Sequence, residues 1–571
     1  TGIGKTMSVL FPALKSMGNE SVGPIFYLTA RGTTRTAAEN ALAILRDTEP
    51  ELHLRSVTLT AKDKICLCET RECTPEACPY ANGYYARIKG ALWDVLDVPC
   101  LTAETLQEYA KRHTVCPFEL GLDSSLWSDV IIGDYNYLFD PVVHLVRFFE
   151  SAGDYIFLVD EAHNLPGRAR EMHSAALTKT SFYEAKKLLG KGKSSLKNTL
   201  TKVNDVFIEW RHRAEEETAA RDGRFGKTFF LKERSEEFDH LLNRLCEPLE
   251  AWLDDHREPD ETHTALLQLY FDVRAWLRVA DTFDDHFVLQ ITASGSEVRA
   301  AQLCLDPSAF LADSFALGRA AVLFSATLAP ASYYKDLCGV PEARAVALRS
   351  PFPAGNQGLF CIGNVSTRYK DRDASLAIVE ESLATMVRAR CGNYLAFFPS
   401  YAYMEQAYAQ FKEHCPEINC IKQENAMDEQ QKAAFLAQFV PGPSQTLLGF
   451  AVMGGVFGEG VDLTGDRLIG VGIVGPGLPQ VGPRQEQLRD YFEKTRGTGF
   501  DYAYRYPGMN KVLQAAGRVI RTPRDKGVVL LIDNRFAMPD YRRLMPPHWS
   551  HLKMIYDTEE LERELWRFWE E

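Results

Sequence analysis

The chain has 571 residues, of which 46% are hydrophobic and 25% charged, and its formal net charge is −13. This length predicts about three to four domains, and the composition is that of an ordinary globular protein. The acidic balance excludes a wholly basic nucleic-acid coat protein, but it is compatible with nucleic-acid binding through a local basic track. The sequence has no apolar run long enough to cross a membrane, so we expect no membrane partner.

The first motif in the chain is TGIGKT at residues 1–6, which matches the second half of a Walker A phosphate-binding loop. In such a loop, backbone amides hold phosphates, the lysine pairs with the outer phosphate oxygens and the threonine hydroxyl binds magnesium. The candidate nucleotide-binding residues are therefore Gly2, Gly4, Lys5 and Thr6. Because the first glycine of the loop would precede residue 1, we expect a fragment of a longer chain. A chance Gly-Lys-Thr is the alternative, which the motifs further along disfavour.

An α/β domain is expected to begin in residues 1–65, with a strand at 25–29. The segment 66–117 then interrupts it with six of the 13 cysteines, namely Cys66, Cys68, Cys73, Cys78, Cys100 and Cys116. In a protein with intracellular motifs, such a local cluster is typical of a metal site rather than of a disulfide framework. Four thiolates can hold a 4Fe–4S cluster or a zinc ion, and the lack of a C-x-x-C pair disfavours a zinc ribbon. Free thiols without a metal are the remaining alternative.

The α/β domain is expected to resume at 118–175, with one strand at 130–134 and another at 156–159. The continuous apolar run of the second strand is typical of a buried parallel strand. It leads directly into the sequence DEAH at residues 160–163. A strand that ends in adjacent carboxylates suits a magnesium–nucleotide site, in which Asp160 holds the metal and Glu161 orients or deprotonates a water.

Residues 176–290 have a different pattern, because strands become rare and charged amphipathic stretches dominate. This pattern predicts an inserted helical domain. The first α/β domain is expected to end with residues 291–344, and a second α/β domain is expected at 345–571, with strands at 392–398 and 527–533.

The sequence QAAGRVIR at residues 514–521 lies in this second domain. Its arginines could reach the γ-phosphate of a nucleotide bound to the first domain. Phosphoryl transfer needs charge neutralisation around the transferred group, and division of the charges between two domains makes their closure depend on ATP. Together with the DEAH sequence, and in this order, the motif indicates a nucleic-acid motor.

Five motifs together resemble those of one known family: the Walker A remnant, the DEAH sequence, Ser-Ala-Thr at 325–327, GEGVD at 458–462 and residues 514–521. In this order they are similar to the superfamily 2 DNA helicases of the XPD/DinG type. The resemblance covers nearly the whole chain, since the cysteine segment and residues 176–290 occupy the places of that family's cluster and arch domains. It implies an α/β fold of two RecA-like motor domains with an inserted Fe–S cluster domain and a helical arch domain.

The resemblance also implies roles for individual residues. In the first motor domain, Lys5 and Thr6 would bind the phosphates and magnesium, Asp160 would hold the metal and Glu161 would activate water. His163 would link the nucleotide state to the second domain. The residues that would couple hydrolysis to motion are Ser325 and Thr327.

In the second motor domain, the implied site residues fall into two groups. Those that would line the interdomain cleft are Gly458, Glu459 and Asp462. Those that would face the γ-phosphate are Gln514, Arg518 and Arg521, with one of the two arginines as the arginine finger. Such a finger is typically worth about 10³ to 10⁵ in rate.

For the cysteine segment, the resemblance favours an iron–sulfur cluster over zinc. The expected ligands are Cys66, Cys73, Cys78 and Cys116. The last three lie at or near prolines, which suits tight loops around a cluster. Cys68 is a rival for Cys66, because the two are separated by a single residue.

Single-stranded DNA is expected to cross both motor domains, where aromatic side chains could stack on its bases. The candidates, for each of which core packing is the more common role, are Tyr135, Tyr137, Phe398, Tyr401 and Tyr403. The alternating Tyr502, Tyr504 and Tyr506 could form a stripe on one face of a strand, again more often for packing.

The implied protein is an ATP-dependent DNA helicase with ATP, Mg²⁺ and a 4Fe–4S cluster, and its partners are single-stranded DNA and forked or tailed duplex DNA. The resemblance further implies 5′→3′ travel, a role in DNA repair or replication, and a bacterial cytoplasmic, nucleoid-associated location. One alternative is the helicase part of a nuclease–helicase. Another is a catalytically silent DNA-binding scaffold, which the intact motifs disfavour. A DEAH-box RNA helicase is also considered, and the cysteine segment disfavours it.

Overall fold

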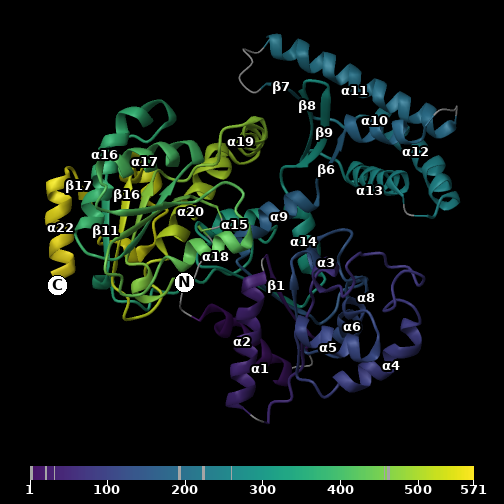
Figure 1. Cartoon of the computed structure of the whole chain (residues 1–571), viewed down its shortest axis with the longest axis horizontal. Coiled ribbons are helices and arrows are strands. Elements are labelled where there is room, and N and C mark those ends of the chain that lie inside the picture. Colours follow the sequence, from purple (N-terminus) through teal and green to yellow (C-terminus); the bar gives the residue numbers. More distant parts are fainter. Residues whose placement is uncertain are drawn as a thin grey trace.

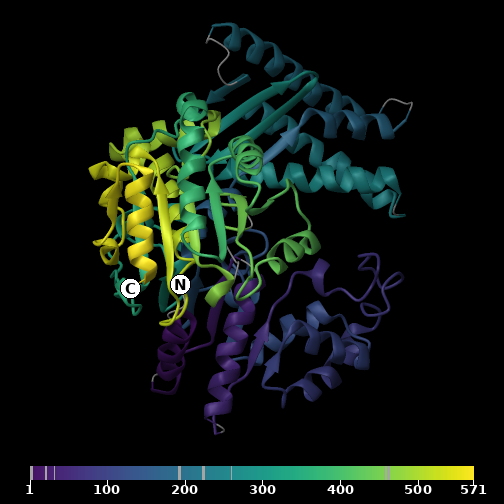
Figure 2. The same ribbon diagram turned by 60° about the vertical axis from the view of Figure 1, so that its left-hand side comes forward.

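The computed structural model describes residues 4–570 apart from 20–21, 31, 50, 191–193, 221–225, 259, 456 and 459–462. The described residues form two α/β domains and a separate helical part with its own small sheet, which extends away from both (Figures 1 and 2). No helix within these ranges is both long and apolar enough to cross a bilayer.

The first α/β domain is built on a six-stranded sheet in the order β10-β5-β1-β4-β2-β3, with parallel pairing throughout. Its strands are β1 (Ile25–Thr29), β2 (Ser56–Thr58), β3 (Cys100–Leu101), β4 (Val130–Asp134), β5 (Ile156–Asp160) and β10 (Ala320–Phe324). The strands predicted at 25–29, 130–134 and 156–159 are confirmed. β1 lies between β4 and β5 and is buried along its whole length, as the continuous apolar pattern requires.

Helices flank this sheet and connect its strands. They are α1 (Lys5–Asn19), α2 (Gly32–Thr48), α7 (Asn136–Phe139), α8 (Val146–Phe149), α9 (Leu165–Met172), α14 (Ser308–Ala316) and α15 (Ala331–Leu337). One hydrophobic cluster on the sheet contains Leu10, Tyr27 and Leu158, so α1 is packed directly against the strands that carry the motifs.

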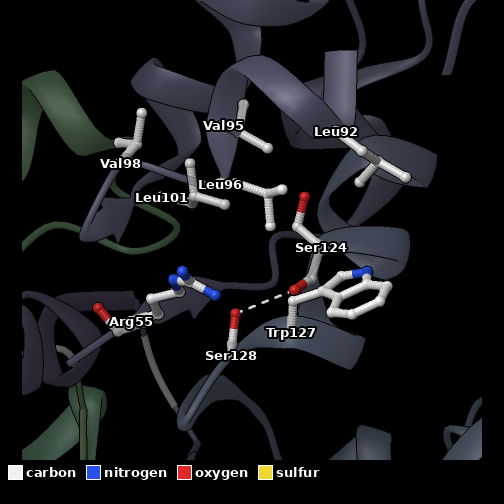
Figure 3. Close-up of a pocket in the computed structure, with 10 residues that line it drawn as sticks. Arg55, Leu92, Val95, Leu96, Val98, Leu101, Ser124, Trp127 and Ser128 are labelled. Carbon is white, nitrogen blue, oxygen red and sulfur yellow. Dashed lines mark hydrogen bonds between the residues drawn. The ribbon is translucent and has the colours of Figure 1, made fainter. Parts of the chain in front are cut away.

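The cysteine segment folds as short helices that share a hydrophobic core with the first sheet. These helices are α3 (Lys62–Ile65), α4 (Tyr84–Val95), α5 (Ala103–His113) and α6 (Pro117–Ser124). A shallow groove lies between α4, the turn after α6 and the β2–β3 edge of the sheet, where Leu96, Ser124 and Trp127 line it (Figure 3). Since β5 lies on the other side of β1 and β4, this groove is separate from the DEAH strand.

The helical insertion contains a sheet that its sequence pattern did not predict. Its elements are β6 (Ala175–Thr178), α10 (Lys179–Leu188), α11 (Ser195–Ala220), β7 (Lys227–Leu231), α12 (Glu236–Asp255), α13 (Glu261–Asp281), β8 (Phe287–Ser294) and β9 (Glu297–Cys304). The four strands pair antiparallel in the order β6-β9-β8-β7. The helices pack through a buried core in which Trp276 Nε1 donates to Asp239 Oδ1 over 2.8 Å.

The second α/β domain has a seven-stranded parallel sheet in the order β13-β14-β12-β15-β16-β11-β17. Its strands are β11 (Gln357–Ile362), β12 (Asn393–Phe398), β13 (Asn419–Lys422), β14 (Leu447–Val452), β15 (Gly470–Val474), β16 (Gly527–Ile532) and β17 (Lys553–Ile555). Its helices are α16 (Arg372–Arg388), α17 (Tyr401–His414), α18 (Glu429–Ala437), α19 (Pro483–Arg496), α20 (Tyr506–Ala516), α21 (Pro539–Arg542) and α22 (Thr558–Glu570). The strands predicted at 392–398 and 527–533 are therefore confirmed.

The hypothesis of a strand stripe at the three alternating tyrosines is wrong. Tyr502 and Tyr504 lie in a π-helical turn, Asp501–Arg505, and Tyr506 begins α20. The rings of Tyr502 and Tyr506 pack on Tyr333, with centroids at 5.0 Å and 5.1 Å. These tyrosines therefore join the second domain to α15 of the first.

Candidate nucleotide site between the two α/β domains

The candidate nucleotide site lies at the carboxyl edge of the first sheet, where β5 ends at Asp160 and α1 begins at Lys5. Ligands of open α/β sheets bind at this edge, and helix N-termini there attract anions. Glu161 has a φ of 48°, in the left-handed region, as the chain turns sharply out of β5. Lys5 Nζ donates to Glu161 Oε1 over 2.8 Å. The two motifs thus meet in one place.

Glu161 is one end of a hydrogen-bond chain that reaches the second domain. Ser325 Oγ donates to Glu161 Oε2 over 2.9 Å, and His163 Nδ1 lies 2.7 Å from Ser325 Oγ. On the other side of the imidazole, Gln514 Nε2 lies 2.6 Å from His163 Nε2. Because Gln514 is on α20, the chain of contacts crosses from one α/β domain to the other.

These contacts are mutually consistent for one tautomer of His163. With the proton on Nδ1, the imidazole donates to Ser325 and its Nε2 accepts from the Gln514 amide. Ser325 and Lys5 then each donate to one oxygen of Glu161. Three successive hydrogen bonds therefore connect Gln514 to the Glu161 carboxylate.

The two carboxylates of the DEAH sequence have opposite electrostatic surroundings. Burial raises the pKa of Glu161, but His163, whose Nδ1 lies 3.3 Å from Oε2, and the charge of Lys5 outweigh it, so the pKa lies well below its ordinary value. Burial also raises the pKa of Asp160, which stays above its ordinary value although the Tyr27 hydrogen bond opposes the shift. A cation bound at Asp160 would favour its ionised form.

Asp160 and Thr6 lie on either side of one buried hydroxyl group. The hydroxyl of Tyr27 donates to Asp160 Oδ2 over 2.6 Å. The hydroxyl oxygen of Tyr27 also lies 3.4 Å from Thr6 Oγ1. A carboxylate and a hydroxyl, together with phosphate oxygens, are the ligands that Mg²⁺ prefers. The donor set therefore fits a magnesium–nucleotide complex.

In the second domain, the structure places the predicted arginines just after α20. Arg518 Nη2 donates to the carbonyl oxygen of Gly458 over 3.0 Å, which joins two of the predicted motifs. The backbone N–H of Arg521 donates to Asp525 Oδ2 over 2.7 Å.

Gly4 has a φ of 70° and immediately precedes α1. The predicted residues Gly2, Glu459 and Asp462 lie outside the described residues, and Thr327 is buried.

The cysteines of residues 66–116 are only partly brought together. Cys68 Sγ lies 3.8 Å from Cys78 Sγ, and the backbone N–H of Cys68 donates to Cys66 Sγ over 3.5 Å. Burial and the adjacent Cys78 raise the pKa of Cys68 to about 11. Cys73 is exposed, and Cys116 occupies the N-cap position of α6. Among the described residues, no three Cys, His, Asp or Glu side chains are arranged as a metal site.

Polar contacts nevertheless hold the cysteine-bearing loops beside one another. Arg87 donates to the carbonyl oxygens of Pro79, at 3.1 Å, and of Thr114, at 2.9 Å. These carbonyls follow Cys78 and precede Cys116. Gln107 Nε2 donates to the carbonyl oxygen of Ile65 over 3.1 Å, next to Cys66. Soft thiolate donors from neighbouring loops fit an iron–sulfur cluster by their chemistry.

Most of the predicted base-stacking aromatics are core residues. Their exposed fractions are 0% for Tyr135, 7% for Tyr137, 0% for Phe398 and 1% for Tyr403, so the stacking hypothesis is wrong for these four. Their rings belong to the hydrophobic cores of the two α/β domains. Tyr401 is partly buried, and its hydroxyl accepts from Gln423 Nε2 over 2.6 Å.

Sequence reasoning missed the contacts that surround Asp160. The Tyr27 hydroxyl reaches its carboxylate and the Tyr135 hydroxyl donates to its main-chain carbonyl. Tyr27 stands in the middle of an apolar strand, where a tyrosine is ordinarily read as packing. The one available signal was a hydroxyl in a fully buried strand, which requires a polar partner.

Two family models match the chain. The model described as Helicase C-terminal domain matches residues 383–552, and the model described as DEAD_2 matches residues 49–182. The second match spans the cysteine segment and the DEAH sequence, and the first spans most of the second α/β domain.

Curated relatives and a solved structure agree with these models. The chain is 24% identical over 539 residues to the General transcription and DNA repair factor IIH helicase subunit XPD of Schizosaccharomyces pombe, a match that spans 78% of the chain and 67% of that protein. It is 22% identical to the ATP-dependent DNA helicase CHL1 of Coccidioides immitis, over 79% of the chain and 60% of that protein. A solved XPD helicase superposes on the chain with a TM-score of 0.63 at 17% sequence identity. The match covers 98% of this chain and 95% of the chain in that structure. This likeness confirms the fold expected from the sequence.

Proposed function

Because the chain belongs to the XPD/DinG-like superfamily 2 helicases, we propose that it is an ATP-dependent DNA helicase that travels along single-stranded DNA. The observation that carries the proposal is the contact chain from Lys5 through Glu161 and His163 to Gln514. A protein that only binds nucleotide has no need to connect its water-activating carboxylate to a second domain. A motor does, because hydrolysis must alter the position of one domain against the other.

Lys5 has two candidate partners, Glu161 and the phosphates of ATP. When its ammonium group binds the phosphates, Oε1 of Glu161 loses a donor and can accept a proton from the attacking water. Ser325 keeps the other carboxylate oxygen in place. Arg518 or Arg521 supplies positive charge from the second domain, which is the role of an arginine finger.

Mg²⁺ bound with the nucleotide would neutralise charge on the phosphates, and Asp160 and Thr6 are the residues that would hold it. For the cluster, Cys66, Cys73, Cys78 and Cys116 would be the ligands of a 4Fe–4S centre, with Cys68 as the rival of Cys66. The cluster would cross-link the loops that carry these cysteines, whose neighbouring residues also share one hydrophobic core. The close approach of Cys68 to Cys78 supports a cluster in this segment. Either Cys66 or Cys68 can then be the first ligand.

We further propose 5′→3′ travel, unwinding of forked or tailed duplexes in DNA repair or replication, and a bacterial cytoplasmic, nucleoid-associated location. These finer statements are supported by family resemblance. The DNA would cross the two α/β domains beside the helical insertion, which lies above the first domain at the upper right of Figure 2.

Strand displacement tests the proposal. Duplexes with a 5′ tail, a 3′ tail or no tail are incubated with the full-length protein, ATP and Mg²⁺, and the Glu161→Gln variant is run beside them. We expect release of the displaced strand only from the 5′-tailed duplex and only with the wild type. Release from the 3′-tailed duplex alone would contradict the polarity. ATP-independent release that Glu161→Gln retains would contradict a helicase.

A further inference from the structure

The hydroxyl of Tyr27 lies between the two side chains that the proposed function assigns to magnesium. It contacts Asp160, at the end of β5, and Thr6, in the first turn of α1. None of the sequence motifs includes Tyr27. We propose that Tyr27 is a positioning residue that holds the two magnesium ligands of this site in register, an inference that rests on the proposed function.

The position of the Tyr27 ring is fixed by its surroundings. It belongs to β1, which pairs with β4 on one side and β5 on the other, and its exposed fraction is 0%. The ring packs edge-on against Phe324, with centroids 6.0 Å apart. A hydroxyl carried by so constrained a ring can act as a fixed point against which more mobile groups are oriented.

The donors around Asp160 determine the plane of its carboxylate. Oδ2 accepts from the Tyr27 hydroxyl over 2.6 Å, and Oδ1 accepts from the backbone N–H of Glu161 over 2.8 Å. Each carboxylate oxygen can accept a second interaction, so both remain able to ligate a cation. The carboxylate therefore cannot rotate without the loss of one of these two hydrogen bonds.

The same hydroxyl can also hold Thr6. The Tyr27 hydroxyl is the donor toward both Asp160 Oδ2, over 2.6 Å, and Thr6 Oγ1, over 3.4 Å, so its single hydrogen is shared unequally between them. Thr6 Oγ1 therefore faces this hydroxyl and retains a lone pair for the cation. One buried hydroxyl thus sets the orientation of a ligand on α1 and of another on β5.

Partners in this position affect metal binding strongly. Loss of a group that orients a metal ligand typically weakens metal affinity by about 10- to 100-fold. The effect should be large for Mg²⁺, which demands near-octahedral geometry and tolerates misplaced ligands poorly. Nucleotide binding without metal should depend on Lys5 and the loop amides, which Tyr27 does not contact in the described part of the chain.

The test is Tyr27→Phe, which removes the hydroxyl and retains the ring. Its matched control is Tyr135→Phe, since that hydroxyl is also buried and also contacts Asp160, but at the main-chain carbonyl. Full-length proteins are loaded with a non-hydrolysable ATP analogue and titrated with Mn²⁺, whose binding is followed by electron paramagnetic resonance. Metal-free analogue binding and thermal unfolding are measured in parallel.

We expect Mn²⁺ affinity to fall by about 10- to 100-fold in Tyr27→Phe, with metal-free analogue binding retained and a melting temperature similar to that of Tyr135→Phe. Wild-type Mn²⁺ affinity in Tyr27→Phe would overturn the inference, as would an equal loss in Tyr135→Phe. If the wild type itself bound no Mn²⁺–analogue complex, the proposed function would fail and the inference with it.

Discussion

The contact between Gln514 and His163 gives a quantitative prediction. The substitution Gln514→Leu keeps the side chain close to its original volume and removes the amide that lies 2.6 Å from His163 Nε2. The imidazole is only 5% exposed, so water cannot readily replace the lost donor. A buried acceptor left without a partner costs about 1–3 kcal/mol, which corresponds to roughly 5- to 150-fold in an equilibrium constant.

That cost falls on the arrangement of the two domains in this structure, in which Gln514 and His163 meet. We therefore expect Gln514→Leu to lower the rate of ATP hydrolysis in the presence of single-stranded DNA. A cost of about 1–3 kcal/mol corresponds to a decrease of roughly 5- to 150-fold. ATP affinity should be retained, because Lys5 is unchanged. The matched control is Gln438→Leu, an exposed glutamine in the same domain, which should keep the stimulated rate.

A double-mutant cycle with His163→Ala tests the reasoning directly. If the two residues act through one contact, the double variant should be no slower than the slower single variant, because the interaction can be lost only once. Additive losses in the double variant would refute a shared contact. An unchanged stimulated rate in Gln514→Leu would refute the proposed link between the domains.

Two further predictions concern stability and the cysteine segment. Asp533→Ala should destabilise the second domain by about 3–5 kcal/mol, measured by urea unfolding, because it removes a fully buried carboxylate and leaves the partly buried Arg535 without its partner. Burial raises the pKa of Asp533, but its hydrogen bonds with Arg535 and Thr367 lower it below the ordinary value. This stabilisation is therefore complete above about pH 4 and lost as pH falls through the folded pKa, a dependence that Asp533→Ala should abolish. Cys78→Ala should lose bound iron and visible absorbance in anaerobic preparations, whereas exposed Cys391→Ala in the second domain should retain both.

The parallel strands and the motif order were predictable because their signals are local. The strand at 156–159 is a continuous apolar run that leads into adjacent carboxylates, and β5 occupies Ile156–Asp160. Lys5 and Glu161 are 156 positions apart in the sequence and form a contact in the fold. Only the family resemblance made this contact predictable. Propensity and periodicity contain no information on such distant contacts.

The small antiparallel sheet was missed because most of its pairing is distant in sequence. Thr178 pairs with Arg299, and Lys227 pairs with Ala293. A local signal existed in the hairpin between Phe287–Ser294 and Glu297–Cys304, whose turn contains Gly295 with a φ of 61°. A two-residue turn with glycine between two apolar runs is a strong hairpin pattern.

The proposed motor activity is tested by measuring ATP hydrolysis by the full-length protein with and without single-stranded DNA, beside Glu161→Gln. We expect hydrolysis that single-stranded DNA strongly stimulates and that Glu161→Gln abolishes while ATP binding is retained. Absence of hydrolysis in an iron-replete, anaerobically purified sample would contradict it and favour a DNA-binding scaffold. Hydrolysis that RNA stimulates and DNA does not would contradict the DNA helicase.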